Sequence, residues 1–374
     1  MISYWEKESF SKYDYAIIGG GIVGLSTAIS LRERVPEARI AVIERGLKPT
    51  GASTRNAGFA CFGSLSELVE DVKQLGEDGT LELVELRWKG LLKLLDRIGA
   101  DRLQYHNYGG YELIRKSELK YLDSLDKIND LLSSVFDKEV FKDVTKKLPE
   151  TGMNTKKIKA LLYNRFEGQL HPGEMMRCLW KLASELGIEI LTGARVKHIE
   201  HKDNSVRLSL RGNMDSDKMG INAARVAVCT NAFTKNFFPE IKLEPGRGQV
   251  LITKPIPNLK LRGAYHMDRG FYYFRNVGDR LLFGGGRNLQ MAEESTTEFG
   301  KNDIILESLK GYMNNIILPG VPVKIDQKWS GIMAFGKNKR PIVKQHLPNL
   351  SLIHISEPTR LESKSRIAAY GCKW

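Results

Sequence analysis

The sequence predicts an α/β fold, and two stretches of it carry that prediction. The first, YDYAIIGGGIVGLSTAISLRERVPEARIAVIER, has the order of strand, glycine-rich turn, helix and strand that is typical of a parallel βαβ unit. The second lies between residues 249 and 283, where short β-branched and aromatic runs indicate the strands of a separate sheet. At 374 residues the chain is long enough for two domains.

Three elements of the first stretch follow from its hydrophobic pattern. Tyr15–Ile18 is a short apolar run that predicts a buried strand, and Ile40–Ile43 predicts a second one. Between them, Leu25–Arg34 places apolar residues on one side at helical spacing. Such a strand–helix–strand unit is the setting in which a glycine-rich turn binds a dinucleotide, so the sequence predicts a Rossmann-like unit.

The turn of this unit carries the G-x-G-x-x-G pattern. Gly19 permits a tight turn, Gly21 lets the backbone approach a pyrophosphate, and Gly24 lets helix and strand pack closely. The first turn of the helix offers unpaired N–H groups and a positive dipole end to the phosphates. Glu44 ends the second strand, where an acid can bind both ribose hydroxyls and disfavours a 2′-phosphate. The pattern does not choose between NAD and FAD.

A polar segment, GASTRNAGFA, follows the second strand at residues 51–60. Its hydroxyl, guanidinium and amide groups could bond phosphate and ribityl oxygens, and Gly58 would allow close approach to a ring. Serine, threonine, asparagine and glycine are also the residues of ordinary surface loops, and composition alone favours a loop.

At this point the sequence resembles the D-amino-acid oxidase-like superfamily of FAD-dependent oxidoreductases, which includes glycine, sarcosine and γ-glutamylputrescine oxidases. The resemblance covers about residues 12–347. It rests on DYAIIGGGIVGLSTAISL and AVIER, on GASTRNAGF, and on GQLHPGEMMRCLWKLASELGIEILTGARVKHIE, ARVAVCTNAFTKNFFP, EPGRGQVLIT and KWSGIMAFGKNKRPIV. It implies bound FAD, with the polar segment beside the flavin. The cofactor-binding residues that it implies are Gly19, Gly21, Gly24, Glu44, Arg45, Ser53, Thr54, Arg55, Asn56, Ala57, Gly58, Val196, Thr230 and Asn231.

The resemblance also implies a Rossmann-like FAD-binding domain with an inserted antiparallel-sheet substrate domain. We expect the FAD-binding domain at 1–95, 150–240 and 330–349, and the substrate domain at 96–149 and 241–329. The helices expected are 64–75, 81–98 and 174–186, with an apolar stripe in 116–136. The strands expected are 188–191, 195–199, 225–229, 249–254, 271–275 and 280–283.

Three departures from the family pattern bear on function. WSGIMAFG has no cysteine and GASTRNAGF has no histidine, so noncovalent FAD is expected. Leu281 and Leu282 stand where the sarcosine branch has a lysine that activates oxygen, which leaves the electron acceptor open. Residues 350–374 lack the family's glycine-rich turn, and HISEPTRL resembles translated sequencing-adapter read-through. We therefore expect the sequence from about Leu350 to differ from the natural C-terminus.

The catalytic candidates lie in the expected substrate sheet. A substrate carboxylate would suit the planar fork of an arginine, so Arg275 and Arg287 are candidates and Arg247 is a weaker one. Tyr272 and Tyr273 alternate along a strand, so one of them, taken as Tyr273, would face the flavin. His266 could accept a proton, whereas His171 is interpreted as structural. The alternative without a functional role is that the arginines are surface charges at strand ends and that His266 is a loop residue.

Composition narrows the class of protein further. The net charge is +13, but the lysines and arginines are scattered, so no nucleic-acid partner is expected. The four cysteines have no metal-ligand spacing, which predicts no metal site and no disulfide scaffold and suits a reducing compartment. No signal peptide is visible at the start of the sequence and no apolar run is long enough to span a bilayer, so we expect a cytoplasmic location, with the oligomeric state open.

Together these features predict an FAD-dependent oxidoreductase that removes a hydride from the C–H beside an amine, in an amino acid or polyamine, or from a 2-hydroxy acid. Two alternatives stay open. One is a tRNA-modifying oxidase module, which the basic charge permits. The other is a flavin-binding electron-transfer subunit of a larger dehydrogenase complex.

Overall fold

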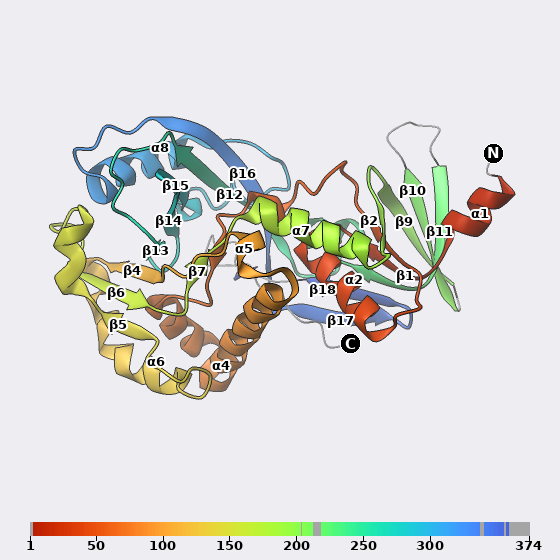
Figure 1. Cartoon of the computed structure of the whole chain (residues 1–374), viewed down its shortest axis with the longest axis horizontal. Coiled ribbons are helices and arrows are strands. Elements are labelled where there is room, and N and C mark those ends of the chain that lie inside the picture. Colours follow the sequence, from red (N-terminus) through yellow and green to blue (C-terminus); the bar gives the residue numbers. More distant parts are fainter. Residues whose placement is uncertain (1–2, 203, 212–217, 337–339, 355–356, 359–374) are drawn as a thin grey trace.

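Two large β-sheets lie at opposite ends of the long axis of the computed structural model, which describes residues 3–202, 204–211, 218–336, 340–354 and 357–358 (Figure 1). The α-helices are α1 Tyr4–Phe10, α2 Ile22–Arg34, α3 Ala52–Arg55, α4 Leu65–Ile98, α5 Ala100–Leu103, α6 Leu125–Leu132, α7 Pro172–Glu185 and α8 Asp303–Tyr312. Short 3₁₀ segments are Lys116–Ser124, Thr145–Thr151, Asn231–Asn236 and Arg287–Leu289, and a π-helical turn spans Met313–Ile317.

The first sheet has the order β17-β18-β11-β1-β2-β8, with the β9–β10 hairpin attached to β11. At its centre β1 runs parallel to both β11 and β2, and all four residues of β2 are buried, as expected for a parallel strand covered on both faces. Helices α2 and α7 pack together over it. Its strands are β1 Lys12–Ile18, β2 Ile40–Ile43, β8 Glu189–Leu191, β9 Arg195–Lys202, β10 Ser205–Arg211, β11 Lys218–Val228, β17 Ile342–Leu347 and β18 Leu350–His354.

The second sheet has the order β19-β16-β12-β15-β14-β13-β4-β6-β5 and is mostly antiparallel. One of its faces packs against α8, and the other faces the segment that follows α3. Its strands are β4 Gly110–Ile114, β5 Phe141–Asp143, β6 Ala160–Asn164, β12 Glu244–Thr253, β13 Ala264–Met267, β14 Tyr272–Val277, β15 Arg280–Gly285, β16 Ile325–Gly336 and β19 Glu357–Pro358. Separately, β3 Phe59–Ala60 pairs with β7 Gly168–Gln169.

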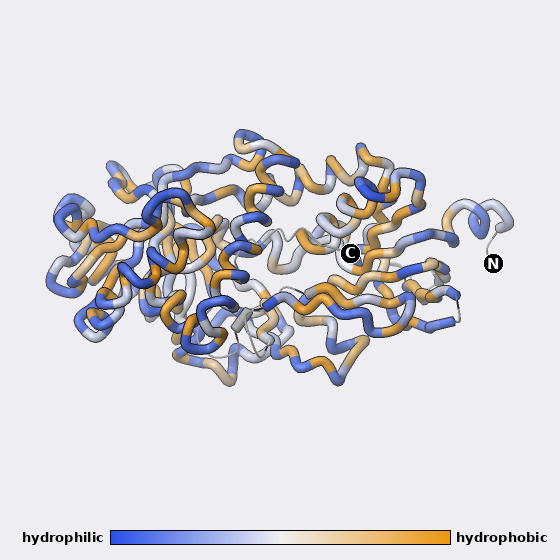
Figure 2. The backbone as a smooth tube through the Cα atoms, turned by 90° about the horizontal axis from the view of Figure 1, so that it is seen from below, coloured by the Kyte–Doolittle hydropathy of each residue, from blue (hydrophilic) through white to orange (hydrophobic). Residues whose placement is uncertain are grey.

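The expected secondary structure is confirmed in most places. The two helices expected at 64–75 and 81–98 both lie within α4, which Gly76 divides into two helical segments with a φ of 74° and a ψ of 175°. A residue with positive φ interrupts helical geometry, which explains why the pattern looked like two helices. Within the described residues no helix is both long and apolar enough to cross a membrane. Figure 2 shows hydrophobic stretches along the strands and more hydrophilic connections between them.

Sheet membership differs from the expected domain limits. β6 lies in the second sheet although residues from 150 on were expected in the cofactor domain, and β16 extends the second sheet past residue 330. β18 belongs to the first sheet and runs parallel to β11, so the residues from 350 to 354 complete that sheet instead of lying outside it. The residues that follow, 355–356 and 359–374, lie outside the described part of the chain.

Candidate functional site

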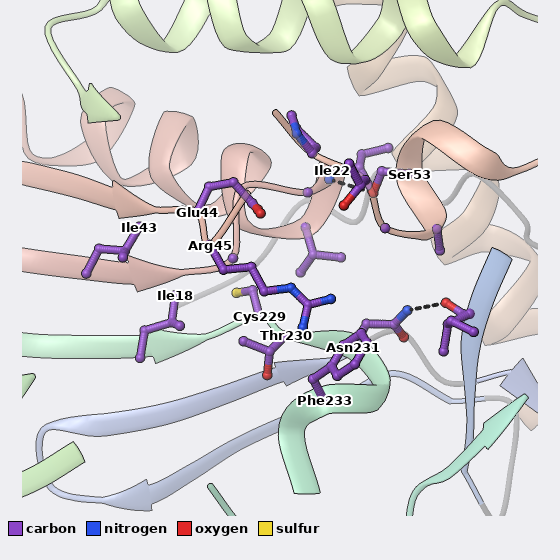
Figure 3. Close-up of a pocket in the computed structure, with 18 of the residues that line it drawn as sticks. Ile18, Ile22, Ile43, Glu44, Arg45, Ser53, Cys229, Thr230, Asn231 and Phe233 are labelled. Carbon is purple, nitrogen blue, oxygen red and sulfur yellow. Dashed lines mark hydrogen bonds between the residues drawn. The ribbon is translucent and has the colours of Figure 1, made fainter. Parts of the chain in front are cut away.

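A cavity of about 520 Å³ opens at the carboxyl ends of β1, β2 and β11, where ligands bind in open α/β sheets (Figure 3). It continues past α3 to Ile332–Ala334 of β16 in the second sheet. The residues expected to bind the cofactor that line it are Gly19, Gly21, Glu44, Arg45, Ser53, Asn56, Val196, Thr230 and Asn231.

The glycine turn is shaped by two close backbone approaches. Gly19 has a φ of +109°, and a Cβ there would lie 2.5 Å from the carbonyl oxygen of Cys229. A Cβ at Gly24 would overlap the Gly19 carbonyl oxygen and lie 3.2 Å from Cγ2 of Ile17, so α2 could not pack on β1 with any larger residue. Gly21 is the N-cap of α2 and lines the cavity, which leaves the helix N-terminus open to an anion.

Glu44 fastens the turn to the end of β2. Its Oε2 accepts the Gly20 N–H at 3.0 Å, and its Oε1 accepts the Gly46 N–H at 2.8 Å. The side chain is buried and lines the cavity. A carboxylate has further lone pairs after these two bonds, so it can still accept hydroxyl donors from a ribose.

The polar segment GASTRNAGFA forms α3 and a buried turn instead of a surface loop. Ser53 Oγ accepts the Ile22 N–H at 3.0 Å, which ties α3 to the first turn of α2 (Figure 3). Asn56 caps the segment by accepting the Gly58 N–H at 2.8 Å. Thr54 donates to the Pro49 carbonyl at 3.0 Å, and Arg55 donates to the Ser330 carbonyl at 2.9 Å. Thr54, Arg55, Ala57 and Gly58 do not line the cavity; they hold the residues that do.

A Ser53→Ala variant tests this contact. It is expected to weaken FAD binding about five- to tenfold, because one hydrogen bond of about 1 kcal/mol no longer fixes α3 against the helix N-terminus. The dissociation constant is measured by titrating the apoprotein with FAD and following the quenching of flavin fluorescence. Ser26→Ala on α2 is the matched control, because Ser26 Oγ is buried without a hydrogen-bond partner among the described residues. Equal affinities for the two variants would contradict the assignment.

Positive charge surrounds the end of the cavity near β9. Arg45, Arg195 and Lys197 line it, against the single carboxylate of Glu44. The Arg45 guanidinium lies 3.9 Å from the ring centroid of Phe233, across the opening from the end of β2 (Figure 3). Cations, an open helix N-terminus and a ribose-binding acid together fit the diphosphate and ribose of FAD. Arg195 and Lys197 were not predicted from the sequence, although both flank Val196, which was.

At its other end the cavity meets the second sheet. Asn231, which has a φ of 52°, donates from Nδ2 to the Ile332 carbonyl at 2.9 Å and joins the two sheets here. Across β12 and β16, Gly246 pairs with Met333, and Gly248 pairs with Gly331. Paired residues of antiparallel strands share a face, so three glycines surround Met333 on one face of the sheet. Side chains of Phe335, Arg287 and Arg55 lie against these glycines, and Met333 itself lines the cavity.

None of the four catalytic candidates lines the cavity, and two of them, His266 and Arg275, are buried in fixed contacts. His266 is buried, with Nε2 2.7 Å from Oε2 of Glu167. Arg275 is buried as well and donates to the backbone carbonyls of Ala57, Leu170 (3.1 Å) and Asn276 (3.3 Å). Burial lowers the pKa of Arg275 to about 10. Its guanidinium is occupied in holding the turn after α3, so the structure does not present it to a substrate.

The two tyrosines of β14 lie on opposite faces of the second sheet, and Arg247 and His171 are held in contacts within the protein. Tyr272 points toward α8 and stacks on Tyr312, whereas Tyr273 points to the opposite face and lies edge-on to Phe59, as the alternation predicts. Arg247 is committed to Glu294 through two bonds of 2.8 and 3.0 Å. His171 is the N-cap of α7, accepting the Glu174 N–H at 3.1 Å, and is structural as expected.

Arg287 differs from the other buried arginines. It stacks on the ring of Phe335 at 4.3 Å and donates to Ser295 Oγ at 3.2 Å. Within the described residues it forms no ion pair with a carboxylate, and its Nε has no hydrogen-bond partner. Burial lowers its pKa, which the more distant Glu294 only partly offsets. A Cβ at Gly246 would lie 3.0 Å from its Cζ, so the guanidinium lies beside the glycine that pairs with Met333.

Glu294 fixes the segment between β15 and α8 that carries Arg287 and Phe299. It accepts bonds from Arg247, from Gln249 at 2.9 Å and from Asn302 at 2.9 Å. Desolvation raises the pKa of the carboxyl, but these hydrogen bonds outweigh it and the net pKa is lowered. The stabilisation is therefore present above the ordinary pKa of a glutamate and is lost as the pH falls through the lowered value.

A Glu294→Gln variant is expected to lower the free energy of unfolding by about 3 kcal/mol or more, since it leaves the buried Arg247 cation unpaired. Urea unfolding at neutral pH measures the change, and the same measurement at acid pH should show the gap between variant and parent narrowing. The exposed neighbour provides the control, Glu293→Gln, which is expected to be near neutral. A destabilisation that is the same in both variants would refute the assignment.

Comparison with known proteins places the chain among flavoenzymes. Residues 14–359 match the family model described as FAD dependent oxidoreductase (DAO). A probable oxidoreductase, OrdL, of Haemophilus influenzae is 24% identical over 364 residues, which cover 91% of this chain and 78% of the relative. The fold is similar to that of glycine oxidase from Geobacillus kaustophilus (TM-score 0.72, 18% identity, 93% and 90% of the two chains). It is also similar to L-proline dehydrogenase from P. horikoshii (TM-score 0.73, 19% identity, 92% and 88%).

Proposed function

The chain belongs to the DAO family of FAD-dependent oxidoreductases, and from that premise we propose that its substrate carries a carboxylate beside the carbon that is oxidised. The substrate is then an amino acid or a 2-hydroxy acid. It loses a hydride from the carbon that bears its amine or hydroxyl, and FAD, when bound, supplies the hydride acceptor.

We assign each part of the cofactor to the residues that line or support the cavity. Gly19, Gly21 and Gly24 shape the turn for the pyrophosphate, and Glu44 takes the ribose. Ser53 and Asn56 line the cavity where the chain passes from the first sheet to the second, and we assign them to the middle of the cofactor. Arg45, Val196, Thr230 and Asn231 complete the wall, and Thr54, Arg55, Ala57 and Gly58 support α3 from behind. In this assignment the first sheet holds the cofactor noncovalently and the second sheet forms the substrate side.

Arg287 is the observation that carries the carboxylate proposal. Burying a guanidinium without an ion-pair partner costs desolvation free energy. A substrate carboxylate would offset that free energy by accepting two parallel hydrogen bonds. The buried arginines of the second sheet, Arg247 and Arg275, already donate hydrogen bonds to groups of the protein itself. Arg287 does not line the cavity itself, but it lies beside Gly246, which pairs with Met333 of the cavity wall. The similar solved structures named as glycine oxidase and L-proline dehydrogenase support an amino-acid type of substrate.

Anaerobic mixing tests the proposal without assuming an electron acceptor. The FAD-loaded protein is mixed with pairs of compounds that differ only in the carboxylate: an L-amino acid and the amine left by its decarboxylation, or a 2-hydroxy acid and the corresponding alcohol. Bleaching of the flavin absorption reports hydride transfer. We expect at least one carboxylated member to bleach the flavin at a rate that its partner does not approach. Bleaching only by amines such as polyamines would overturn the carboxylate proposal and leave the flavoenzyme assignment intact.

A further inference from the structure

A second group of chemically reactive side chains lies buried away from the cavity. Cys61 follows β3, Glu167 precedes β7 and His266 lies in the middle of β13. One ligand atom from each, the Cys61 sulfur, a Glu167 carboxylate oxygen and a His266 ring nitrogen, lies within 4.8 Å of the other two. All three side chains are more than nine-tenths buried, and none of the three lines the cavity. The cofactor and the proposed substrate site therefore leave this cluster unexplained.

The orientation of the donors suits a metal ion. His266 directs Nε2 at Oε2 of Glu167, 2.7 Å away, and directs Nδ1 toward Oε2 of Glu67, 3.8 Å away. The second carboxylate thus stands behind the ring, as the outer partner of a metal-bound histidine does. Oε1 of Glu167 is buried and has no hydrogen-bond partner in the described part of the chain. An orphaned carboxylate oxygen in a dry interior is costly unless a cation or a donor reaches it.

The charge around the cluster points the same way. Glu67 and Glu167 are both fully buried, and the imidazole of His266 lies between them. We propose that Cys61, Glu167 and His266 bind a divalent transition-metal ion of the zinc type, with Glu67 as the positioning residue behind His266. Thiolate, imidazole and carboxylate are together the ligand set of zinc, and magnesium and calcium would not select a cysteine.

The site would join three segments that are far apart in the sequence. Cys61 lies one residue after β3, so a metal there would anchor the chain just beyond the turn that Arg275 holds from the other side. No cysteine–histidine spacing reveals such a site, because each ligand comes from a different element. This is why the spacing of cysteines in the sequence predicts no metal.

The first experiment uses the FAD-loaded, full-length protein. It is incubated with Zn²⁺, freed of excess metal by gel filtration and assayed for zinc and protein by mass spectrometry. About one zinc per chain is expected for the parent and for Cys178→Ser, which removes another buried cysteine on α7. Cys61→Ser and Glu167→Gln are each expected to lose most of the bound zinc. Two variants are used so that the test still holds if one of them fails to fold. Zinc at background in the parent, or equal in Cys61→Ser and Cys178→Ser, would overturn the proposal.

Cobalt provides a readout that zinc cannot. Co²⁺ bound by a thiolate gives ligand-field bands in the red, where oxidised flavin absorbs little, and a sulfur-to-cobalt charge-transfer band at shorter wavelength. The parent and Cys178→Ser are expected to show both after incubation with Co²⁺, and Cys61→Ser is expected to lose the charge-transfer band. Absence of both in the parent would refute the metal site.

Discussion

An Arg287→Met variant is expected to lose kcat/KM toward its carboxylated substrate by about 100- to 1000-fold, equivalent to about 3–4 kcal/mol. Methionine keeps an unbranched apolar stem against Phe335 but removes the charge and the donors. The remaining substrate carboxylate would then be buried without a partner, which is where most of the loss arises. Steady-state kinetics with an artificial electron acceptor measures the effect, after FAD content has been shown to equal that of the parent.

Arg280→Met is the matched control for that variant. Arg280 begins β15, the strand that precedes Arg287, but its guanidinium pairs with Asp326 at the surface. A change of less than threefold is expected there. Arg287→Lys should fall between the two, because it restores the charge without the planar fork. If Arg287→Met and Arg280→Met have equal kcat/KM, Arg287 does not bind the substrate.

A Gly24→Val variant is expected to produce colourless protein that is strongly destabilised. The added Cβ would collide with the Gly19 carbonyl oxygen, which α2 cannot avoid without leaving β1. Displacing α2 would move the helix N-terminus and the Ser53 contact together, so the cofactor would lose the wall that faces its phosphates. The ratio of flavin absorbance to protein absorbance after purification measures the loss, and thermal unfolding measures the stability.

Gly311→Ala offers the comparison for a glycine that nothing crowds. It lies in α8, has no positive φ, and a Cβ there would meet no atom within 4 Å. It is expected to keep its flavin and to gain a little stability, because alanine is the better helix former. Normal flavin content in Gly24→Val would show that the turn does not hold the cofactor as described.

The parts of the fold that the sequence predicted are those written in local patterns. The βαβ unit is encoded by buried apolar runs and three glycines within thirty residues, and both strands and the helix lie where the pattern predicts them. The helix begins at Ile22 instead of Leu25 because Gly21 serves as its N-cap. The polar segment was harder to interpret, since its composition suits a loop equally well; its partners Ile22 and Ser330 decide the matter and lie elsewhere in the chain.

The parts that could not be predicted depend on partners from distant segments. β13 pairs in parallel with β4, which lies about 150 residues earlier, and no local signal fixes that pairing. His266 and Arg275 look like solvent-facing candidates in sequence, but Glu167 and the carbonyls of Ala57 and Leu170 occupy them in the fold. Arg287 could be distinguished from Arg275 only when their contacts were known.

The end of the chain remains a separate question. Leu350 and Leu352 are buried in β18, and Ile353 lines the cavity. Any strand with apolar residues at these positions could pair with β11 and be buried in the same way, so this burial does not show that the sequence is the natural one. The expectation that the sequence after about residue 350 departs from the natural one is tested by resequencing the source DNA around that codon. An intact genomic reading frame that encodes the same residues would refute it.

The cavity between the two sheets is the centre of this account, and the visible absorption spectrum of the purified chain tests it most directly. We predict the two absorption bands of an oxidised flavin, and release of FAD itself, at about one per chain, when the protein is denatured. Release into the supernatant would also establish noncovalent attachment. A colourless protein that takes up no added FAD, even with a family-like C-terminus restored, would contradict the account.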